Sequence, residues 1–381
     1  MIYLDNAATS FPKAPGVVEA VTDCLERVGG NPQRAGHALS LAASRIVYDT
    51  RTRLAALLSA PDPSRIVFTA NATDALNTAL RGVLRPGDHV VTTSIEHNAV
   101  ARPLRALEAQ GVELTRVQCT PTGELDVADF AAALRHDTRL AVVVHASNIL
   151  GAVLPIADVS AAAHERGVPL LIDAGQTAGH VPIDVQGDGI DLLAFTGHKG
   201  LLGPQGTGGL YVAEGTQVEP LRRGGTGSQS ESDVQPEFLP DRFESGTLNT
   251  PGIAGLGAAL AFIARERLDS LRAHELRLTE MLLDGLGAAD AVSLYGPREA
   301  AGRVGLVAFN VGELDPAEVA ERLESEYEII SRPGLHCAPW AHATMGTLQR
   351  GAVRLSVSPF TEEGEVEQAV RAVCAIARRH G

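Results

Sequence analysis

One lysine of this chain occupies a position that suits covalent chemistry. Lys199 closes the segment Thr196-Gly197-His198-Lys199, directly after the apolar run of residues 191–195. A lysine at the exit of a buried strand contributes little to solubility, but its amine is well placed to form an imine with an aldehyde. The alternative is an ordinary loop lysine, which would be the natural interpretation without the neighbouring histidine and threonine.

Polar side chains also follow the ends of four further predicted strands. They are Asn71-Ala72-Thr73, Glu96-His97, Ser147-Asn148, and Asp173 with Gln176 close behind. In an open α/β sheet, ligands bind beyond the carboxyl ends of the strands. We therefore expect these groups, together with Lys199, to form a polar cup on an apolar floor.

Each member of this cup has a simpler structural interpretation. Thr73 could be only a helix N-cap, although the same helix start would also seat a phosphate. His97 could be a hydrogen-bonded surface histidine, and the glycines of residues 197–209 could serve turns rather than close approach to a ligand. Asp173 could cap the following turn, but a carboxylate directly after an apolar strand is costly unless a positive group meets it.

Taken together, these groups match the requirements of pyridoxal phosphate chemistry. The lysine would form an imine with the cofactor aldehyde, and the acid would hold the pyridine nitrogen protonated so that the ring withdraws electrons. A histidine ring would stack on the pyridine, and the hydroxyl-rich helix start would take the phosphate. The cup offers all four parts.

Short apolar runs that alternate with helical patterns predict the scaffold for this cup. The expected strands are residues 65–69, 88–93, 113–117, 140–145, 169–173, 191–196 and 208–212, and the expected helices are 39–58, 74–84, 98–110, 127–135 and 156–166. This alternation predicts an α/β fold with a mostly parallel sheet covered by helices on both faces. Residues 214–250 are rich in Gly, Ser, Pro and charge and are predicted to form a loop.

The remainder of the chain predicts a smaller α+β domain. One long helix is expected over residues 253–286, followed by strands at 304–310, 328–330 and 352–356 and helices at 316–324 and 361–380. We therefore expect a large domain of residues 14–255 and a small domain made of residues 1–13 and 256–381.

Composition argues against several classes of protein. Of the 381 residues, 45% are hydrophobic and 20% are charged, as in ordinary globular proteins, and no apolar run approaches the roughly 18 residues of a membrane span. The net charge of −14 argues against nucleic acid or an anionic membrane as a partner.

Cys24, Cys119, Cys337 and Cys374 lack CxxC spacing, so we expect neither a disulfide framework nor a metal site. The N-terminus shows no signal-peptide pattern, and the expected location is a reducing cytoplasm.

At its motif residues the chain resembles the cysteine desulfurases and selenocysteine lyases, which are class V aminotransferase-like enzymes of pyridoxal phosphate fold type I. The resemblance runs nearly from end to end, and the pair of DxxQ and TGHK motifs in this order is highly specific. Its segments are Tyr3-Leu-Asp-Asn-Ala-Ala-Thr9, Asn71-Ala-Thr73, Glu96-His-Asn98, Ser147-Asn148, Asp173-Ala-Gly-Gln176, Thr196-Gly-His-Lys199, Phe243-Glu-Ser-Gly-Thr247 and Arg332-Pro-Gly-Leu-His-Cys-Ala338.

The resemblance implies a role for each matching residue. Lys199 would be the Schiff-base lysine and the base at the substrate Cα, and His97 would stack on the cofactor ring. Asp173 would pair with the pyridine nitrogen, and Gln176 with the ring hydroxyl. The residues implied at the cofactor phosphate are Ala72, Thr73, Thr196 and His198, joined in a homodimer by Gly246 and Thr247 of the neighbouring subunit. Asn148 would lie beside the cofactor and would bind the substrate carboxylate together with Arg354. Asn6, Ala7 and Ala8 would line the substrate pocket.

The resemblance also assigns a role to one cysteine. Cys337 would attack the sulfur of L-cysteine and become a persulfide, which requires a thiolate and hence a lowered pKa. His336 and Arg332 are close in sequence and could assist. The alternative is a buried core cysteine, but its setting among Gly and Pro indicates a loop. For the other three cysteines we expect simple packing roles.

Departures from the family pattern leave the exact substrate open. The compact segment after Cys337 resembles the second group of desulfurases, whose sulfur leaves with help from an acceptor protein. Pro333 stands where that group often has Ser or Thr, the N-terminal helix common in that group is missing, and residues 222–229 have no clear role. Conversion of L-cysteine to L-alanine is the leading hypothesis. The alternatives are a selenocysteine lyase, a C–S lyase or epimerase without a persulfide, and a non-catalytic nucleotide-binding module.

Overall fold

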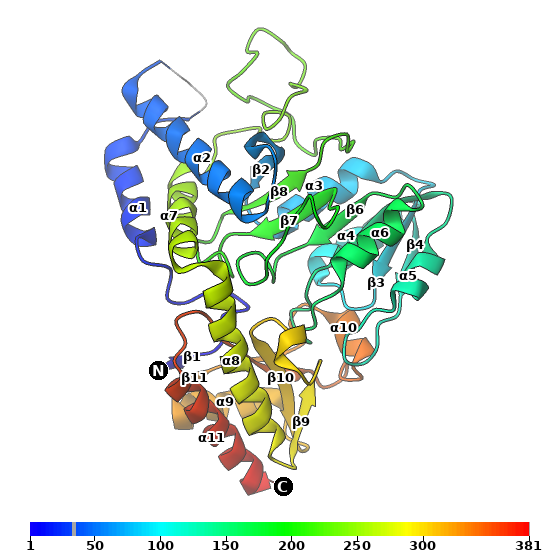
Figure 1. Cartoon of the computed structure of the whole chain (residues 1–381), viewed down its shortest axis with the longest axis vertical. Coiled ribbons are helices and arrows are strands. Elements are labelled where there is room, and N and C mark those ends of the chain that lie inside the picture. Colours follow the sequence, from blue (N-terminus) through cyan, green and yellow to red (C-terminus); the bar gives the residue numbers. More distant parts are fainter. Residues whose placement is uncertain (33–35, 381) are drawn as a thin grey trace.

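A seven-stranded sheet forms the centre of the larger part of the molecule in a computed structural model that describes residues 1–32 and 36–380 (Figure 1). Its strands are β2 (Ile66–Thr69), β3 (His89–Thr93), β4 (Glu113–Val117), β5 (Thr138–Val144), β6 (Leu170–Asp173), β7 (Leu192–Thr196) and β8 (Gly208–Val212). Their order is β2-β8-β7-β6-β5-β3-β4. Only β8 runs against its neighbours, so the carboxyl ends of β2, β3, β5, β6 and β7 share one edge of the sheet.

Helices cover both faces of this sheet because successive strand residues point to opposite faces and both sets are apolar. In β6, Leu171 faces one core, whereas Leu170 and Ile172 face the other. The first core contains α3 (Ala72–Val83) and α4 (Asn98–Glu108). The second contains α2 (Ala38–Leu57), α5 (Val127–Ala133), α6 (Ile156–His164) and α7 (Thr250–Glu266), with α1 (Val17–Asp23) and its π-helical extension Cys24–Val28 packed on α7.

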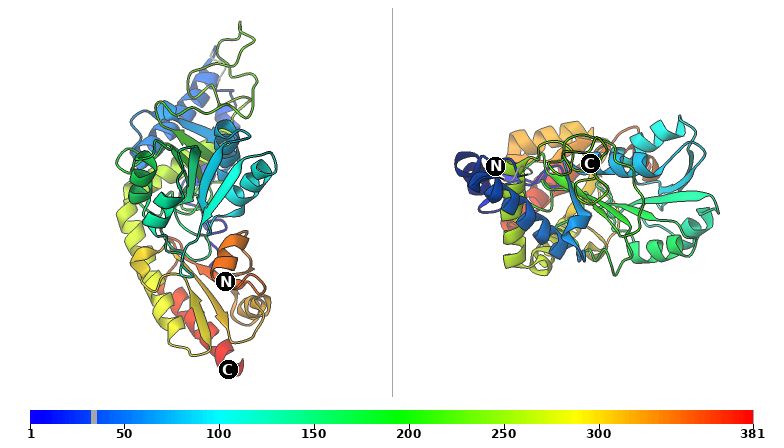
Figure 2. Two further views of the ribbon diagram at one scale, coloured as in Figure 1. Left: turned by 90° about the vertical axis from the view of Figure 1, so that its right-hand side faces the viewer. Right: turned by 90° about the horizontal axis from the view of Figure 1, so that it is seen from above.

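A second, smaller sheet lies at the other end of the molecule (Figures 1 and 2). It is antiparallel and contains β9 (Val292–Tyr295), β10 (Leu306–Val311), β12 (Arg332–Gly334) and β13 (Ala352–Ser356), in the order β12-β13-β10-β9. The N-terminal strand β1 (Ile2–Tyr3) pairs in parallel with β11 (Ile329–Ile330). The surrounding helices are α8 (Leu268–Gly287), α9 (Pro316–Tyr327) and α11 (Glu363–His380), and α8 and α11 lie side by side over a separate core. The short helix α10 (Pro339–Thr344) packs towards the large sheet, where the Thr344 hydroxyl donates to the Ser94 carbonyl at 3.0 Å.

The predicted mixed α/β class with a mostly parallel sheet is confirmed. One predicted element is wrong in form: residues 253–286 are not one helix but parts of α7 and α8, which are separated at Arg267, where φ is +68°. The predicted domain division between residues 255 and 256 falls inside α7.

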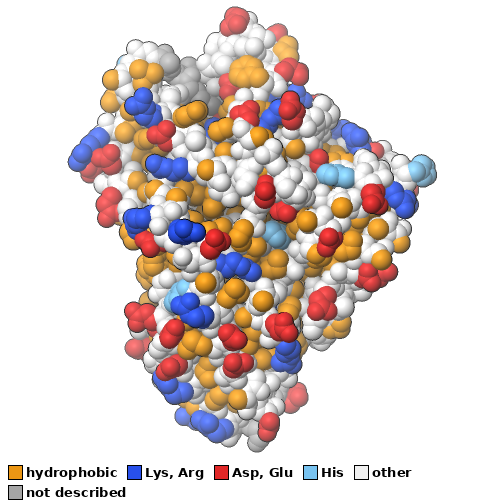
Figure 3. Space-filling model, viewed as in Figure 1, with side chains coloured by type: hydrophobic (Ala, Val, Ile, Leu, Met, Phe, Trp, Pro, Cys, Tyr) orange, Lys and Arg blue, Asp and Glu red, His pale blue; other side chains and the backbone are white. Residues whose placement is uncertain are grey.

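The face shown in Figure 3 carries acidic, basic and apolar side chains interspersed over its whole length. Among the described residues, none of the helices has the length and apolar character needed to cross a membrane.

Candidate active site

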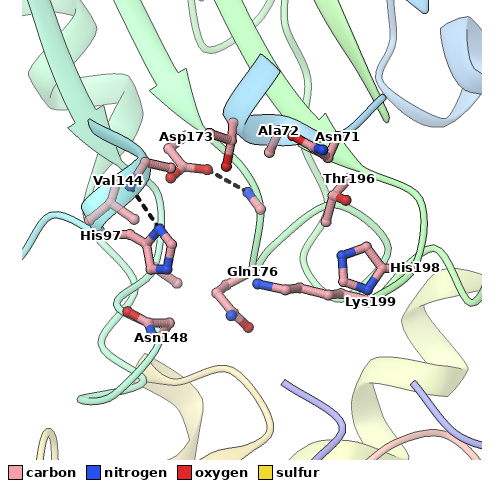
Figure 4. A pocket seen from close by; sticks show the side chains of 14 residues that line it. Asn71, Ala72, His97, Val144, Asn148, Asp173, Gln176, Thr196, His198 and Lys199 are labelled. Atoms are coloured by element: carbon pink, nitrogen blue, oxygen red, sulfur yellow. Dashed lines mark hydrogen bonds between the residues drawn. The ribbon is translucent and has the colours of Figure 1, made fainter. Parts of the chain in front are cut away.

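The carboxyl edge of the large sheet encloses a cavity of about 90 Å³, into which the predicted strand ends bring their polar groups (Figure 4). Its floor is apolar at Val144 and Ala146, as a buried strand end requires. The lining residues are Asn71, Ala72, Thr73, His97, Ala99, Val144, Ala146, Asn148, Asp173, Gly175, Gln176, Thr196, His198 and Lys199. The cup is therefore a real feature of the fold.

Lys199 lies in a turn directly after β7, with its carbonyl accepting a hydrogen bond from the Leu202 N–H at 2.8 Å. Burial lowers the pKa of its ε-amine to about 8, while the Asp173 carboxylate opposes this effect. Behind the turn, Gly179 (φ +89°) passes so close that a Cβ there would lie 2.3 Å from the Gly200 carbonyl oxygen. This close approach of two backbones fixes the turn that presents the lysine.

Asp173 is the last residue of β6 and lines the cup. Its Oδ1 accepts a hydrogen bond from the Gly175 N–H at 2.9 Å. Burial raises its pKa, while that hydrogen bond and the nearby Lys199 amine act in the opposite direction. Among the described residues, no cationic group forms an ion pair with this buried carboxylate, so it remains available to a positively charged N–H.

His97 begins α4 as its N-cap, because its Nδ1 accepts a hydrogen bond from the Ala99 N–H at 3.0 Å. This bond places the ring proton on Nε2. Burial, followed by the charges of Lys199 and Arg332, lowers the His97 pKa to about 3. The ring that faces the cavity is therefore a neutral aromatic surface.

The start of α3 forms the opposite wall of the cup. The alternative in which Thr73 is the N-cap is wrong: Asn71 caps the helix, with its Oδ1 accepting from the Asp74 N–H at 3.0 Å. The Ala72 and Thr73 amides are thus first-turn donors that an α-helix cannot satisfy internally. Gly208 lets β8 approach closely here, since a Cβ would lie 2.7 Å from the Asn71 Cα.

Two residues of the TGHK segment complete this wall. Thr196 ends β7, and its hydroxyl lies 3.5 Å from the Thr207 carbonyl oxygen. His198 pairs through Nδ1 with the Thr9 hydroxyl at 3.1 Å. Burial and then the charges of Lys199 and Lys13 lower the His198 pKa to about 4, so this ring is neutral at physiological pH.

The N-terminal segment closes one side of the cup through Gln176, whose Nε2 donates to the Ala7 carbonyl at 3.1 Å. The Ala7 N–H in turn donates to the Ser356 hydroxyl at 2.9 Å. Ala8 follows in the same turn and is half-buried. Residues from the two ends of the chain and from the large sheet therefore meet here.

Arg354 of β13 is buried to 1% exposure, and its guanidinium already has two partners. One terminal nitrogen lies 2.8 Å from Asp5 Oδ1, and the other donates to the Asn148 carbonyl at 2.8 Å. Its Nε is buried without a partner among the described residues. Arg332, on the neighbouring strand β12, is the register partner of Arg354. Its positive charge helps to lower the pKa of both His97 and Lys199.

Cys337 is exposed and belongs to an unusual backbone segment. His336 and Cys337 both have left-handed φ values, +50° and +56°, a conformation that non-glycine residues adopt at a cost. The Asn148 side chain donates to the His336 carbonyl at 2.7 Å, and the Asn98 N–H donates to the Cys337 carbonyl at 2.8 Å. These bonds hold the cysteine segment against the start of α4 and the wall of the cup.

The suggestion that His336 helps to ionise Cys337 receives no support from its environment. Burial and then the Arg354 charge lower the His336 pKa to about 3, so the ring supplies no positive charge. Instead its Nε2 lies 2.9 Å from the Arg332 carbonyl oxygen, and its ring stacks on His342. The histidine anchors the segment mechanically.

Two residues predicted to contact a cofactor phosphate in the neighbouring subunit do not line the cup of their own chain. Gly246 and Thr247 are exposed and line a different cavity, and the Gly246 N–H donates to the Gly225 carbonyl. Arg222, from the glycine-rich stretch without an assigned role, forms an ion pair of 2.8 Å with Asp74. That stretch is therefore tied to the first turn of α3.

The expectation that Glu96 and Ser147 belong to the polar groups of the cup is wrong, because neither lines its cavity. The Glu96 side chain is completely buried. Its Oε1 accepts from the Thr93 hydroxyl at 2.6 Å and from the Val144 N–H at 2.9 Å. Burial raises its pKa to about 8, so the group is protonated at neutral pH. The sequence signal for this residue was its position directly before His97, the histidine predicted to stack on the cofactor ring.

The remaining cysteines have the environments of packing residues. Cys24 and Cys119 are buried, and Cys374 is half-buried in α11. Burial raises the pKa of the Cys119 thiol to about 11, which leaves it protonated and unreactive.

Comparisons with known proteins agree with this geometry. The aminotransferase class V family model matches residues 2–369. A protein of Methanothermobacter thermautotrophicus named "Probable cysteine desulfurase" is 35% identical over 372 residues, which cover 96% of this chain and 92% of that protein. A cysteine desulfurase of Yersinia pseudotuberculosis is 36% identical over 348 residues, covering 89% and 84% of the two chains.

Solved structures of similar fold cover the chain from end to end. The apo cysteine desulfurase of Thermococcus onnurineus superposes with a TM-score of 0.92 at 33% identity, covering 99% of this chain and 95% of the other. The Escherichia coli cysteine desulfurase CsdA, in an S-sulfonic acid form, superposes with a TM-score of 0.88 at 28% identity, covering 99% and 94%.

Proposed function

This chain belongs to the aminotransferase class V family, among the cysteine desulfurases, and from that premise we propose that it converts L-cysteine to L-alanine and retains the sulfur as a persulfide on Cys337. The observation that carries the proposal is that Lys199, Asp173 and His97 line one cavity, while Cys337 lines an adjoining groove that shares His97 with it. Pyridoxal 5'-phosphate is the proposed cofactor.

The residues of the cup fit this cofactor. Asp173 offers a buried carboxylate without an ion-pair partner among the described residues, which suits a protonated pyridine nitrogen. The Ala72 and Thr73 amides at the start of α3, with Thr196 and the neutral His198, offer donors for a phosphate. His97 offers a neutral ring for stacking, and one Gln176 amide hydrogen remains for the ring hydroxyl.

When bound, the cofactor would supply an electron-withdrawing ring that stabilises negative charge at the substrate Cα. Lys199 would hold the cofactor covalently and then carry the Cα proton. Its pKa of about 8 makes a sizeable fraction of the ε-amine neutral at physiological pH, as a proton acceptor requires.

Cys337 would act after the Cα proton has moved. Its Sγ attacks the substrate sulfur, an S–S bond forms, and the bond between the substrate Cβ and sulfur breaks with its electron pair left on carbon. Protonation of that carbon gives alanine, so L-cysteine and the enzyme thiol yield L-alanine and an enzyme persulfide with no external oxidant. The exposure of Cys337 supports its access to both substrate and acceptor.

The substrate carboxylate is proposed to bind near Arg354, as the family resemblance implies. The Arg354 Nε is buried and unpaired among the described residues, whereas its terminal nitrogens are engaged with Asp5 and Asn148. Arg332, the register neighbour of Arg354, adds a second guanidinium for the same anion. Asn148, Ala7 and Ala8 would line the remainder of this pocket.

A homodimer is part of the proposal. Gly246 and Thr247 are exposed and lie outside the cup of their own chain, which supports a role for them at the phosphate of a neighbouring subunit. A sulfur-acceptor protein is proposed as the second partner. An exposed thiol that must stay reduced supports a location in a reducing compartment such as the cytoplasm.

Trapping of the persulfide tests this function. Holoenzyme treated with L-cysteine and then alkylated should carry one additional sulfur on the peptide containing Cys337, with alanine formed in equal amount. Cys337→Ala should lose the added sulfur and sustained alanine formation, whereas Cys374→Ala should behave as wild type. Alanine and free sulfide without any persulfide on Cys337 would instead indicate a C–S lyase.

The same variants separate the selenium alternative, which the named relatives do not favour. If Cys337→Ala abolished turnover of cysteine but left selenocysteine turnover intact and faster than wild-type cysteine turnover, the enzyme would be a selenocysteine lyase.

A further inference from the structure

A groove of about 410 Å³ leads from the surface to Cys337. Its walls come from α3 and α4, and it shares Thr73 and His97 with the cup. Cavities of about 300–1,000 Å³ hold drug-sized ligands, so this groove has room for a thiol side chain and its flanking residues. An acceptor of sulfur from Cys337 can approach it through this opening.

The groove is basic although the protein is acidic. Arg81 and Arg102 line it, and none of its ten lining residues is acidic. Arg102 is exposed and forms no ion pair among the described residues. The net charge of the whole chain is −14, so this local excess of positive charge runs against the overall composition.

Two more arginines extend this basic surface beyond Cys337. Arg105 and Arg116 lie over the Trp340 ring of α10, at 5.9 and 4.8 Å from the ring centroid. Both are exposed, and only Arg105 has an acidic neighbour within ion-pair distance, Glu108, among the described residues. A guanidinium stacked on an aromatic ring keeps its edge donors free to bind carboxylates.

We propose that this groove docks an acidic, thiol-bearing segment of a sulfur-acceptor protein. The proposal rests on the desulfurase function argued above and specifies the chemistry of its partner. An acidic enzyme repels an acidic partner over most of its surface, so the Arg81–Arg102 groove and the Arg105–Arg116 extension would orient the partner with its thiol at Cys337.

The transfer itself needs no additional reagent. The acceptor thiolate attacks the outer sulfur of the Cys337 persulfide, a new S–S bond forms on the acceptor, and the bond to the Cys337 Sγ breaks. Cys337 leaves as a thiolate and the acceptor becomes the persulfide. Electrons and atoms balance, and the enzyme returns to its starting state.

Three synthetic peptides of equal length test the charge preference. Each carries one cysteine, flanked by Asp and Glu, by Ser and Gly, or by Lys. Holoenzyme is loaded with L-cysteine, freed of excess substrate and mixed with each peptide, and peptide persulfide is counted by alkylation and mass spectrometry. For each peptide, the ratio of wild-type to variant rate cancels the intrinsic reactivity of its thiol.

We expect Arg102→Glu to slow transfer to the acidic peptide about tenfold or more and to speed transfer to the lysine peptide. Arg81→Glu should act in the same direction. The wild-type rate with the acidic peptide should fall as salt is raised from low to near-molar concentration. Arg139→Glu, an exposed position at the amino end of β5 on the opposite edge of the sheet, should change neither rate.

Separate readouts distinguish the two ideas. A wild-type enzyme that never acquires a persulfide on Cys337 would overturn the proposed function and the docking proposal with it. A normal persulfide with the same ratio of wild-type to Arg102→Glu rate for all three peptides, or with no salt dependence, would overturn only the docking proposal. If Arg102→Glu fails to fold, Arg81→Glu and the wild-type salt series still decide between these outcomes.

Discussion

Removal of a buried carboxylate at Glu244 should destabilise the protein more than any change to a surface ion pair. Glu244 receives two hydrogen bonds from the Arg51 guanidinium, at 2.8 and 2.9 Å, and a third from the Phe68 N–H at 2.7 Å. The Arg51 and Glu244 side chains are 6% and 3% exposed. The pair joins α2 and β2 to the segment that contains Gly246 and Thr247.

The expected loss follows from the charge left behind. Breaking a buried ion pair on one side costs about 3–5 kcal/mol, because the remaining charge is buried without compensation. Arg51 and Glu244 also line a cavity of about 330 Å³, through which water can reach an unpaired guanidinium. Glu244→Ala should therefore lower the free energy of unfolding by about 3 kcal/mol, and Glu244→Gln by about 2 kcal/mol, since the amide still accepts hydrogen bonds.

Urea unfolding followed by circular dichroism measures these changes, at fixed protomer and cofactor concentrations because both shift the apparent stability. Arg51→Met combined with Glu244→Leu should be more stable than Glu244→Ala alone, since no isolated charge remains. Glu367→Ala, which breaks an exposed pair of 3.4 Å with Arg371, should stay within about 0.5 kcal/mol of wild type. Two results would refute the reasoning. One is a loss of unfolding free energy below about 1 kcal/mol for Glu244→Ala. The other is a double variant that loses more unfolding free energy than Arg51→Met and Glu244→Leu lose when their separate losses are added.

Two further predictions concern the lysine. The pKa of Lys199 is lowered to about 8, so capture of pyridoxal phosphate by cofactor-free protein should rise about tenfold per pH unit below 8 and level off above it. A midpoint near the ordinary lysine value of about 10.4 would contradict this. Asp173→Asn should move the midpoint to lower pH, because the Asp173 carboxylate raises the pKa of Lys199. Gly179→Ala should slow the same capture at least about tenfold, because its Cβ would collide with Gly200; Gly167→Ala, which also has a positive φ but open space around it, is the matched control.

The large sheet and the cup at its edge could be predicted because their signals are local. Residues 113–117, 208–212 and 352–356 form strands with the predicted bounds, since each is a β-rich run bounded by turn residues. Parallel strands then bring their carboxyl ends to one edge without further information. For this reason Asp173 and Lys199 could be expected in one cavity although 26 positions separate them in the sequence.

Features set by contacts across the chain could not be predicted in this way. The break at Arg267 carries neither Gly nor Pro, and apolar spacing continues through it because both helices bury one side. The ion pair between Arg354 and Asp5 joins residues 349 positions apart. The short strand β12 includes Pro333, and proline argues against a strand unless the position lies at a sheet edge, as β12 does.

Charged groups from both parts of the fold meet around the cup. Lys199, Arg332 and Arg354 are three basic groups, whereas Asp5 and Asp173 are the acidic groups opposite them. Glu96 adds no negative charge at neutral pH because burial raises its pKa to about 8. The excess positive charge comes from the two arginines of the small sheet, and Arg332 is only five positions before Cys337 in the sequence. In the proposed function, this charge would draw the substrate carboxylate towards the arginines of the small sheet, while Lys199 and Asp173 lie on the side of the large sheet.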